Sequence, residues 1–157
     1  MPKQEQQKTL LVAAIKDGTV IDHITAGHGL SIIRLLGLTA DDKLVTVGLN
    51  LPSRDMGHKD LIKVEDHAIN QDEANRIAIF APKATINIIK QYTVVKKYPV
   101  TLPEKIEGVI ICPNTMCITN HERMSTSFFV RTYKHAIRLR CTYCEKTFHE
   151  SDIAEYR

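Results

Sequence analysis

Short apolar runs separated by polar turns fill the first two thirds of the chain, and each run has the length and the Ile, Leu and Val content of a strand. The turn Lys16–Thr19 interrupts the first run, while Val45, Val47 and Leu49 give another the alternation of a strand with one buried face. A loop at Leu51–Gly57 follows that strand. We expect the strands at Leu10–Ile15 and Val20–Ile24, Lys43–Asn50, Lys59–Glu65, Ala84–Lys90 and Tyr92–Lys97.

Two segments between these strands show the signals of helices. The first has apolar residues at three-residue spacing and ends at Gly37; these residues are Leu30, Ile33 and Leu36. The second begins at Asn70, with Glu73 three residues later as in a capping box, and Pro82 closes it. The order strand, helix, two strands, helix, strand predicts an α+β fold, a ferredoxin-like α/β sandwich with an antiparallel sheet.

A break at Tyr98–Pro103 separates this region from the last third of the chain, because its two prolines favour an extended connection over regular structure. We therefore expect two domains, residues 1–100 and residues 101–157. The second contains all four cysteines, in the patterns C-x4-C and C-x2-C: Cys112, Cys117, Cys141 and Cys144. The apolar runs Val109–Ile111 and Ala136–Leu139 precede the two pairs and predict strands.

Two cysteine pairs on tight loops predict one structural zinc ion bound by four thiolates. The alternatives are disulfides, which a reducing compartment disfavours, and a redox C-x2-C pair, which would leave Cys112 and Cys117 unexplained. His121 and His149 could replace a thiolate, although surface histidines explain them as well. Four thiolates leave no open coordination position, and the metal would supply folding energy to a segment too small to rely on its own core. We expect a small all-β, zinc-ribbon-like domain.

Composition and charge exclude several classes of protein. The chain has 157 residues, 43% of them hydrophobic and 25% charged, and its net charge of +3 gives no nucleic-acid footprint on its own. No apolar run approaches the roughly 18 residues of a membrane span. Residues 1–9 are polar, lack the core of a signal peptide and are expected to be flexible. We predict a cytoplasmic protein that does not bind a membrane.

The first domain lacks a Walker loop, G-x-G-x-x-G and G-x-S-x-G, so the common phosphate-binding and nucleophile motifs are absent from the sequence. Asp22 and His23 have no recognisable partner nucleophile, which favours a structural or binding role. Lys59 and Lys63 lie four apart on one strand and so face the same side, where Lys97 could join them. Converging lysines could neutralise a polyphosphate. Spacing alone favours ordinary solvated lysines.

Positive charge between the cysteine pairs leaves a nucleic-acid-binding zinc-ribbon protein as an alternative. The residues that carry it are Arg131, Lys134, His135, Arg138 and Arg140. The nearby acidic residues count against a basic stripe, and a free-standing nucleotide-binding enzyme is a further alternative. Steep salt dependence would identify the first alternative, and nucleotide turnover the second.

Four motifs occur in the order typical of one family. They are Gly18–Ile24 (GTVIDHI), Gly48–Ser53 (GLNLPS), Met56–Lys63 (MGHKDLIK) and the cysteine frame from Cys112-Pro113-Asn114 to Cys141–Lys146. Together they closely resemble the regulatory chains of aspartate carbamoyltransferase, and the resemblance runs from about Leu10 to Phe148. Such chains have no catalytic activity. The resemblance implies a nucleotide-binding allosteric domain and a zinc domain that contacts the catalytic chain.

The resemblance also implies roles for single residues. Asp22 and His23 would belong to the nucleotide pocket, with Asp22 accepting hydrogen bonds from sugar hydroxyls. Lys59, Lys63 and Lys97 would meet the phosphates. The base and ribose would be lined by Ala14, Ile15, Val20, Asn87, Ile89, Tyr92 and Val94, with main-chain groups near Ile15 and Tyr92 reading the base edge. The loops that meet the catalytic chain would include Asn114, Glu145 and Lys146, while Met116 stands where some relatives place a polar contact residue.

The partners that the resemblance implies are a second regulatory chain, catalytic chains in an assembly of catalytic trimers and regulatory dimers, and nucleoside triphosphates. CTP would inhibit and ATP activate an enzyme of pyrimidine biosynthesis, and UTP assists CTP in some members through the N-terminal segment. No nucleic acid is expected as a partner.

Overall fold

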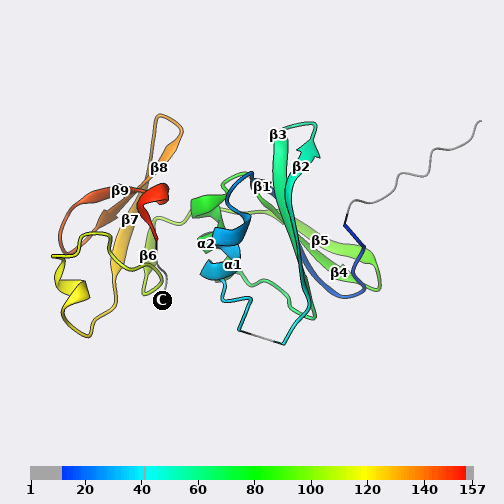
Figure 1. The fold of residues 1–157 in the computed structure, drawn as a ribbon, viewed down its shortest axis with the longest axis horizontal. Coiled ribbons are helices and arrows are strands. Elements are labelled where there is room, and N and C mark those ends of the chain that lie inside the picture. Colours follow the sequence, from blue (N-terminus) through cyan, green and yellow to red (C-terminus); the bar gives the residue numbers. More distant parts are fainter. Residues whose placement is uncertain (1–11, 41, 155–157) are drawn as a thin grey trace, which may run out of the picture.

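Two antiparallel sheets lie at opposite ends of the molecule in this computed structural model, with two helices between them (Figure 1). The structure describes residues 12–40 and 42–154. The expected flexibility of residues 1–9, and the first two residues of the strand expected at Leu10–Ile15, lie outside the described part. Within that part, no helix is long and apolar enough to cross a membrane.

The first sheet has five strands in the order β2-β3-β1-β4-β5. The strands are β1 (Gly18–Thr25), β2 (Val45–Ser53), β3 (Gly57–Glu65), β4 (Thr85–Lys90) and β5 (Thr93–Pro99). The helices that interrupt them are α1 (Gly29–Leu35) and α2 (Gln71–Phe80). The first four strands and the two helices form the ferredoxin-like arrangement, and β5 adds an edge strand to it. The predicted fold class is therefore confirmed.

One face of this sheet forms the core beneath the helices. Ile21 of β1 pairs with Ile62 of β3 and with Ile86 of β4, and all three side chains are fully buried. Since successive side chains in a strand point to opposite faces, the neighbours of these residues face away from α1 and α2. The predicted start of α2 is also confirmed, because Asn70 and Glu73 form a capping box at its N-terminus.

The strand expected at Leu10–Ile15 is wrong over residues 12–15, which are irregular. β1 begins only at Gly18 and is already paired with β3 on one side and β4 on the other. The carbonyls of the preceding segment are instead bound by the Lys63 side chain of β3. Two loops are also shorter than expected, because β2 continues to Ser53 and β5 to Pro99.

The second sheet has four strands in the order β6-β7-β8-β9, packed on a small core with Phe128 and Leu139 at its centre. The strands are β6 (Lys105–Glu107), β7 (Ser127–Tyr133), β8 (Ala136–Cys141) and β9 (Thr147–His149), with 3₁₀ turns η1 (Ile118–Asn120) and η2 (Glu150–Asp152). The expected all-β character is confirmed. The strand expected at Val109–Ile111 is wrong: only Ile110 forms an isolated bridge, and its carbonyl accepts the Thr126 hydroxyl.

Candidate functional site

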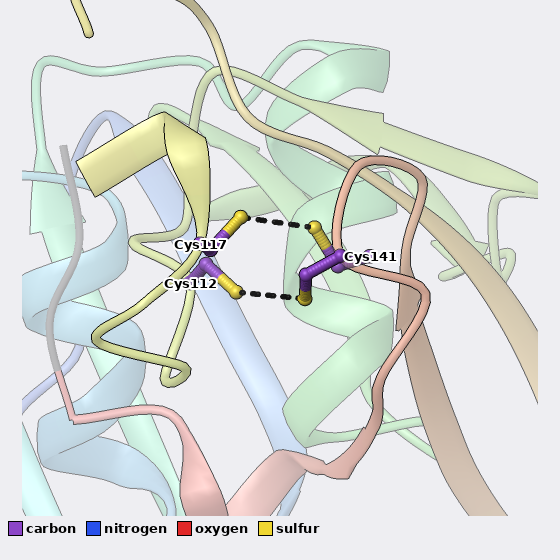
Figure 2. A group of neighbouring side chains, drawn as sticks. Cys112, Cys117 and Cys141 are labelled. Atoms are coloured by element: carbon purple, nitrogen blue, oxygen red, sulfur yellow. Dashed lines mark hydrogen bonds between the residues drawn. The ribbon is translucent and has the colours of Figure 1, made fainter. Parts of the chain in front are cut away.

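The four cysteines converge between the loop that precedes η1 and the turn that follows β8, and their sulfur atoms all lie within 4.8 Å of one another (Figure 2). The Sγ atoms of Cys112 and Cys144 are 3.8 Å apart, as are those of Cys117 and Cys141. A tetrahedral zinc site with bonds of about 2.3 Å has sulfur–sulfur edges of about 3.8 Å. All four thiols are free, so the cluster has the spacing of a metal site and contains no disulfide.

The environment of these thiols favours a bound cation. Burial raises the pKa of Cys112 and of Cys141. Burial also opposes ionisation of Cys117, but hydrogen bonds from Thr119, whose hydroxyl lies 3.2 Å from the sulfur, lower its pKa to about 7. Four thiolates packed this closely repel one another, and a bound divalent ion removes that repulsion. The residues present fit one structural zinc.

Asn120 holds the first cysteine loop in place, although nothing in its sequence context marked it. Its side-chain amide donates to the carbonyl of Cys112 at 3.0 Å and to that of Asn114 at 2.8 Å. The second loop closes through main-chain bonds, in which Cys141 N–H donates to Lys146 and Glu145 N–H donates to Cys141. Only the fold, which places the Asn120 amide beside the carbonyls of Cys112 and Asn114, reveals this role.

The loops around the metal site expose apolar side chains. Met116 is 80% exposed, and Ile118 and Tyr143 are about half exposed. Of the expected contact residues, Glu145 and Lys146 are exposed and Asn114 is half-buried, with its side chain accepting from Met116 N–H. An exposed apolar surface beside polar residues is typical of a protein interface.

The expected nucleotide residues of the first sheet lie on the face away from the helices. Val20 of β1 pairs with Lys63 of β3 and with Asn87 of β4, and Asn87 pairs in turn with Lys97 of β5. Directly paired residues share a face, so Lys63, Val20, Asn87 and Lys97 form one row across four strands. We call these four residues the polar row, after the two lysines and the asparagine among them. The spacing of Lys59 and Lys63 correctly predicted a common face, since both lie on alternate positions of β3.

Asp22 of β1 is an acidic group of this face. Its carboxylate lies 2.8 Å from the ammonium of Lys59 and accepts the main-chain N–H of His23 at 2.6 Å. Partial burial works against ionisation, but these two contacts prevail and lower the pKa of Asp22 below its ordinary value. His23 sits at a bulge of β1 with φ of 56°, and its ring faces the Thr85 hydroxyl at 3.1 Å.

The apolar residues expected in the pocket flank the polar row. Ile89 of β4 pairs with Val94 of β5 and is buried, whereas Val94 is 52% exposed. Ile15 is buried in the segment that precedes β1, beside exposed Ala14, and Tyr92 N–H donates to the carbonyl of Lys16 in that same segment. A cavity of about 640 Å³ near Thr25 and His58 includes none of the expected residues.

Comparisons with known proteins agree along the whole described chain. Residues 10–101 match the family described as "Aspartate carbamoyltransferase regulatory chain, allosteric domain". Residues 104–154 match "Aspartate carbamoyltransferase regulatory chain, metal binding domain".

Similar curated proteins come from several organisms, and each of the following three is named aspartate carbamoyltransferase regulatory chain. The chain is 52% identical to that of Chromobacterium violaceum over 96% of its length and 99% of the relative's. It is 48% identical to that of Vibrio campbellii over 99% of both chains. It is also 48% identical to that of Pyrococcus horikoshii, over 92% of its own length and 95% of the relative's.

Proposed function

This chain belongs to the family of aspartate carbamoyltransferase regulatory chains, and we propose on that basis that it binds nucleoside triphosphates and transmits their occupancy to catalytic chains. The division of labour would follow the two sheets. Residues 1–100 would form the nucleotide-binding unit, and residues 101–157 the zinc unit that contacts the catalytic chain. The chain itself would perform no catalytic step.

The proposed nucleotide site is the face of the first sheet that points away from the helices, which we call the outer face. The polar row on this face is the observation that supports the proposal. Lys97 at one end of the row is exposed on β5, so its ammonium is accessible to phosphate oxygens. Lys59 approaches the same face from β3 and is held by Asp22 at 2.8 Å. Lys63 completes a set of three positive charges. Against them stand the carboxylate of Asp22 and that of Glu65, two positions beyond Lys63 on β3, so positive charge prevails and suits a ligand with several negative charges.

The sugar and base would lie beside the phosphates on the same face. Asp22 remains an acceptor at neutral pH because its pKa is lowered, so ribose hydroxyls can donate to it. His23 would belong to the same pocket, where its ring lies beside Asp22 and Thr85. Apolar and amide side chains would enclose the base and ribose: Ala14, Ile15, Val20, Asn87, Ile89, Tyr92 and Val94. Main-chain groups near Ile15 and Tyr92 would read the base edge.

The metal-site loops are the proposed docking surface for the catalytic chain. Met116, Ile118 and Tyr143 expose apolar surface next to Glu145 and Lys146, and zinc fixes the loops that carry them. We expect regulatory chains to pair as dimers that join catalytic trimers. CTP would inhibit and ATP activate this enzyme of pyrimidine synthesis, each by binding one quaternary state more tightly than the other.

Calorimetric titration of the purified, zinc-loaded chain with CTP and ATP tests the site. Both nucleotides should bind the wild type, and Lys97→Met should weaken both by about tenfold, the value of one charged hydrogen bond. Lys83→Met is the matched control, because it removes an exposed lysine beside the cavity near Thr25 and should leave both affinities unchanged. Absence of binding to the wild type would contradict the proposal.

A further inference from the structure

The segment Val12–Asp17, which we call the strap, crosses the outer face of the first sheet near the start of β1. At its beginning, the Val12 side chain lies close to Gly48 of β2, since a methyl group added at Gly48 would be 3.3 Å from it. At its end, the Lys16 carbonyl accepts Tyr92 N–H at 2.9 Å, and the Asp17 carboxylate accepts Gln91 N–H at 3.1 Å. The strap therefore reaches from β2 to the turn between β4 and β5. In Figure 1 it is the dark-blue chain that leads into β1.

Lys63 fastens the strap to the middle of the sheet. Its ammonium donates to the carbonyl of Ala13 at 2.6 Å and to that of Val12 at 3.1 Å. The side chain is only 9% exposed, so water competes poorly for these donors. An ammonium has three donors, and two of them are already used before any ligand arrives.

Lys97 and Lys63 thus differ although both belong to the polar row. Lys97 is exposed, and its ammonium has no hydrogen-bond or ion-pair partner among the described residues. Lys63 is buried and committed to two main-chain carbonyls. A point charge that serves only phosphates would have no need of such contacts. Their effect is to fix the position of Ala14 and Ile15, the part of the strap that adjoins the proposed base site.

We propose that Lys63 is a positioning residue that clasps the strap over the sheet and so shapes the base and ribose end of the site. The inference rests on the proposed function for the identity of the ligand. Lys63 would contribute to the binding of the nucleoside itself, with or without phosphates, whereas Lys97 would contribute only when phosphates are present.

The test compares CTP with cytidine on the full, zinc-loaded chain by NMR titration, which also measures weak binding. Lys63→Met keeps the aliphatic stem and removes the donors and the charge; it should weaken cytidine by about tenfold and CTP by at least as much, because CTP also loses one of three positive charges near its phosphates. Lys97→Met should weaken CTP and leave cytidine unchanged. If Lys63→Met weakened CTP but not cytidine, or neither ligand, the clasp assignment would be overturned. Failure of both ligands to bind the wild type would instead refute the proposed function.

Hydrogen exchange provides a second measurement that needs no ligand. The amides of Gln91 and Tyr92 donate to the strap, so Lys63→Met should accelerate their exchange while the amides of Ile21 and Ile62 in the central strands keep their protection. Unchanged exchange at Gln91 and Tyr92 would show that the strap stays in place without Lys63. If Lys63→Met does not fold, Lys63→Gln, which keeps one short neutral donor, is measured in the same way and should show the same two effects.

Discussion

Replacement of Asn120 by alanine tests how the protein supports its metal site without touching a ligand. The Asn120 amide donates to two carbonyls of the first cysteine loop, at 3.0 Å and 2.8 Å. Each such bond contributes about 1 kcal/mol, so the variant should lose about 2 kcal/mol of loop stability. If the loss destabilises the zinc-bound state and not the zinc-free state, zinc affinity decreases by about thirtyfold, which is within the range found for groups that support metal ligands.

Competition with a chromophoric chelator measures this affinity directly. Asn70→Ala is the matched control, because Asn70 caps α2 in the other half of the molecule. It should cost about 1 kcal/mol of stability, the usual value of an N-cap, and leave zinc affinity unchanged. Equal zinc affinity in Asn120→Ala and the wild type would refute the reasoning, since it would mean that the loop holds its geometry without the amide.

Two other perturbations follow from the first sheet. The pKa of Asp22 is lowered in the folded state, so its contribution to stability is present above the ordinary value of 3.8 and is lost as the pH falls below it. Denaturant unfolding measured from pH 6 to 3 should therefore show a smaller loss of unfolding free energy in Asp22→Asn than in the wild type. The same dependence of unfolding free energy on pH in both proteins would contradict this. Asp60 is 1% exposed and accepts three main-chain N–H groups, from Gly27, Gly29 and Asn50. Asp60→Ala should therefore cost at least about 3 kcal/mol of unfolding free energy, and a loss below 1 kcal/mol would show that water replaces the carboxylate.

The order of the elements and the metal ligands could be predicted from sequence because both depend on local patterns. The capping pair Asn70 and Glu73 marked the start of α2, and Pro82 follows its end at Phe80. The C-x4-C and C-x2-C spacing identified four residues that the fold brings within 4.8 Å. Each of these signals acts over a few residues, and tertiary structure did not override it.

The wrong predictions concern segments whose local sequence fits more than one structure, so that tertiary contacts decide which one forms. The apolar run before Gly18 has the composition of a strand, but both edges of β1 are occupied, so the segment crosses the sheet as a strap. The alignment of Lys97 with Lys63 depends on the register of three strand pairs, which spacing along the chain does not encode. Asp60 accepts from main-chain groups up to 33 residues away, and Asn120 donates across a loop to carbonyls 6 and 8 residues away; no motif marks such contacts.

The central claim is that nucleotide on the first sheet biases a catalytic chain bound by the zinc unit. Aspartate saturation curves of the complex reconstituted with its catalytic chain test this claim directly, when they are recorded with no nucleotide, with CTP and with ATP. The half-saturating aspartate concentration should rise with CTP and fall with ATP, and both shifts should shrink in Lys97→Met. Three superimposed curves, in a complex shown by calorimetry to bind both nucleotides, would contradict it.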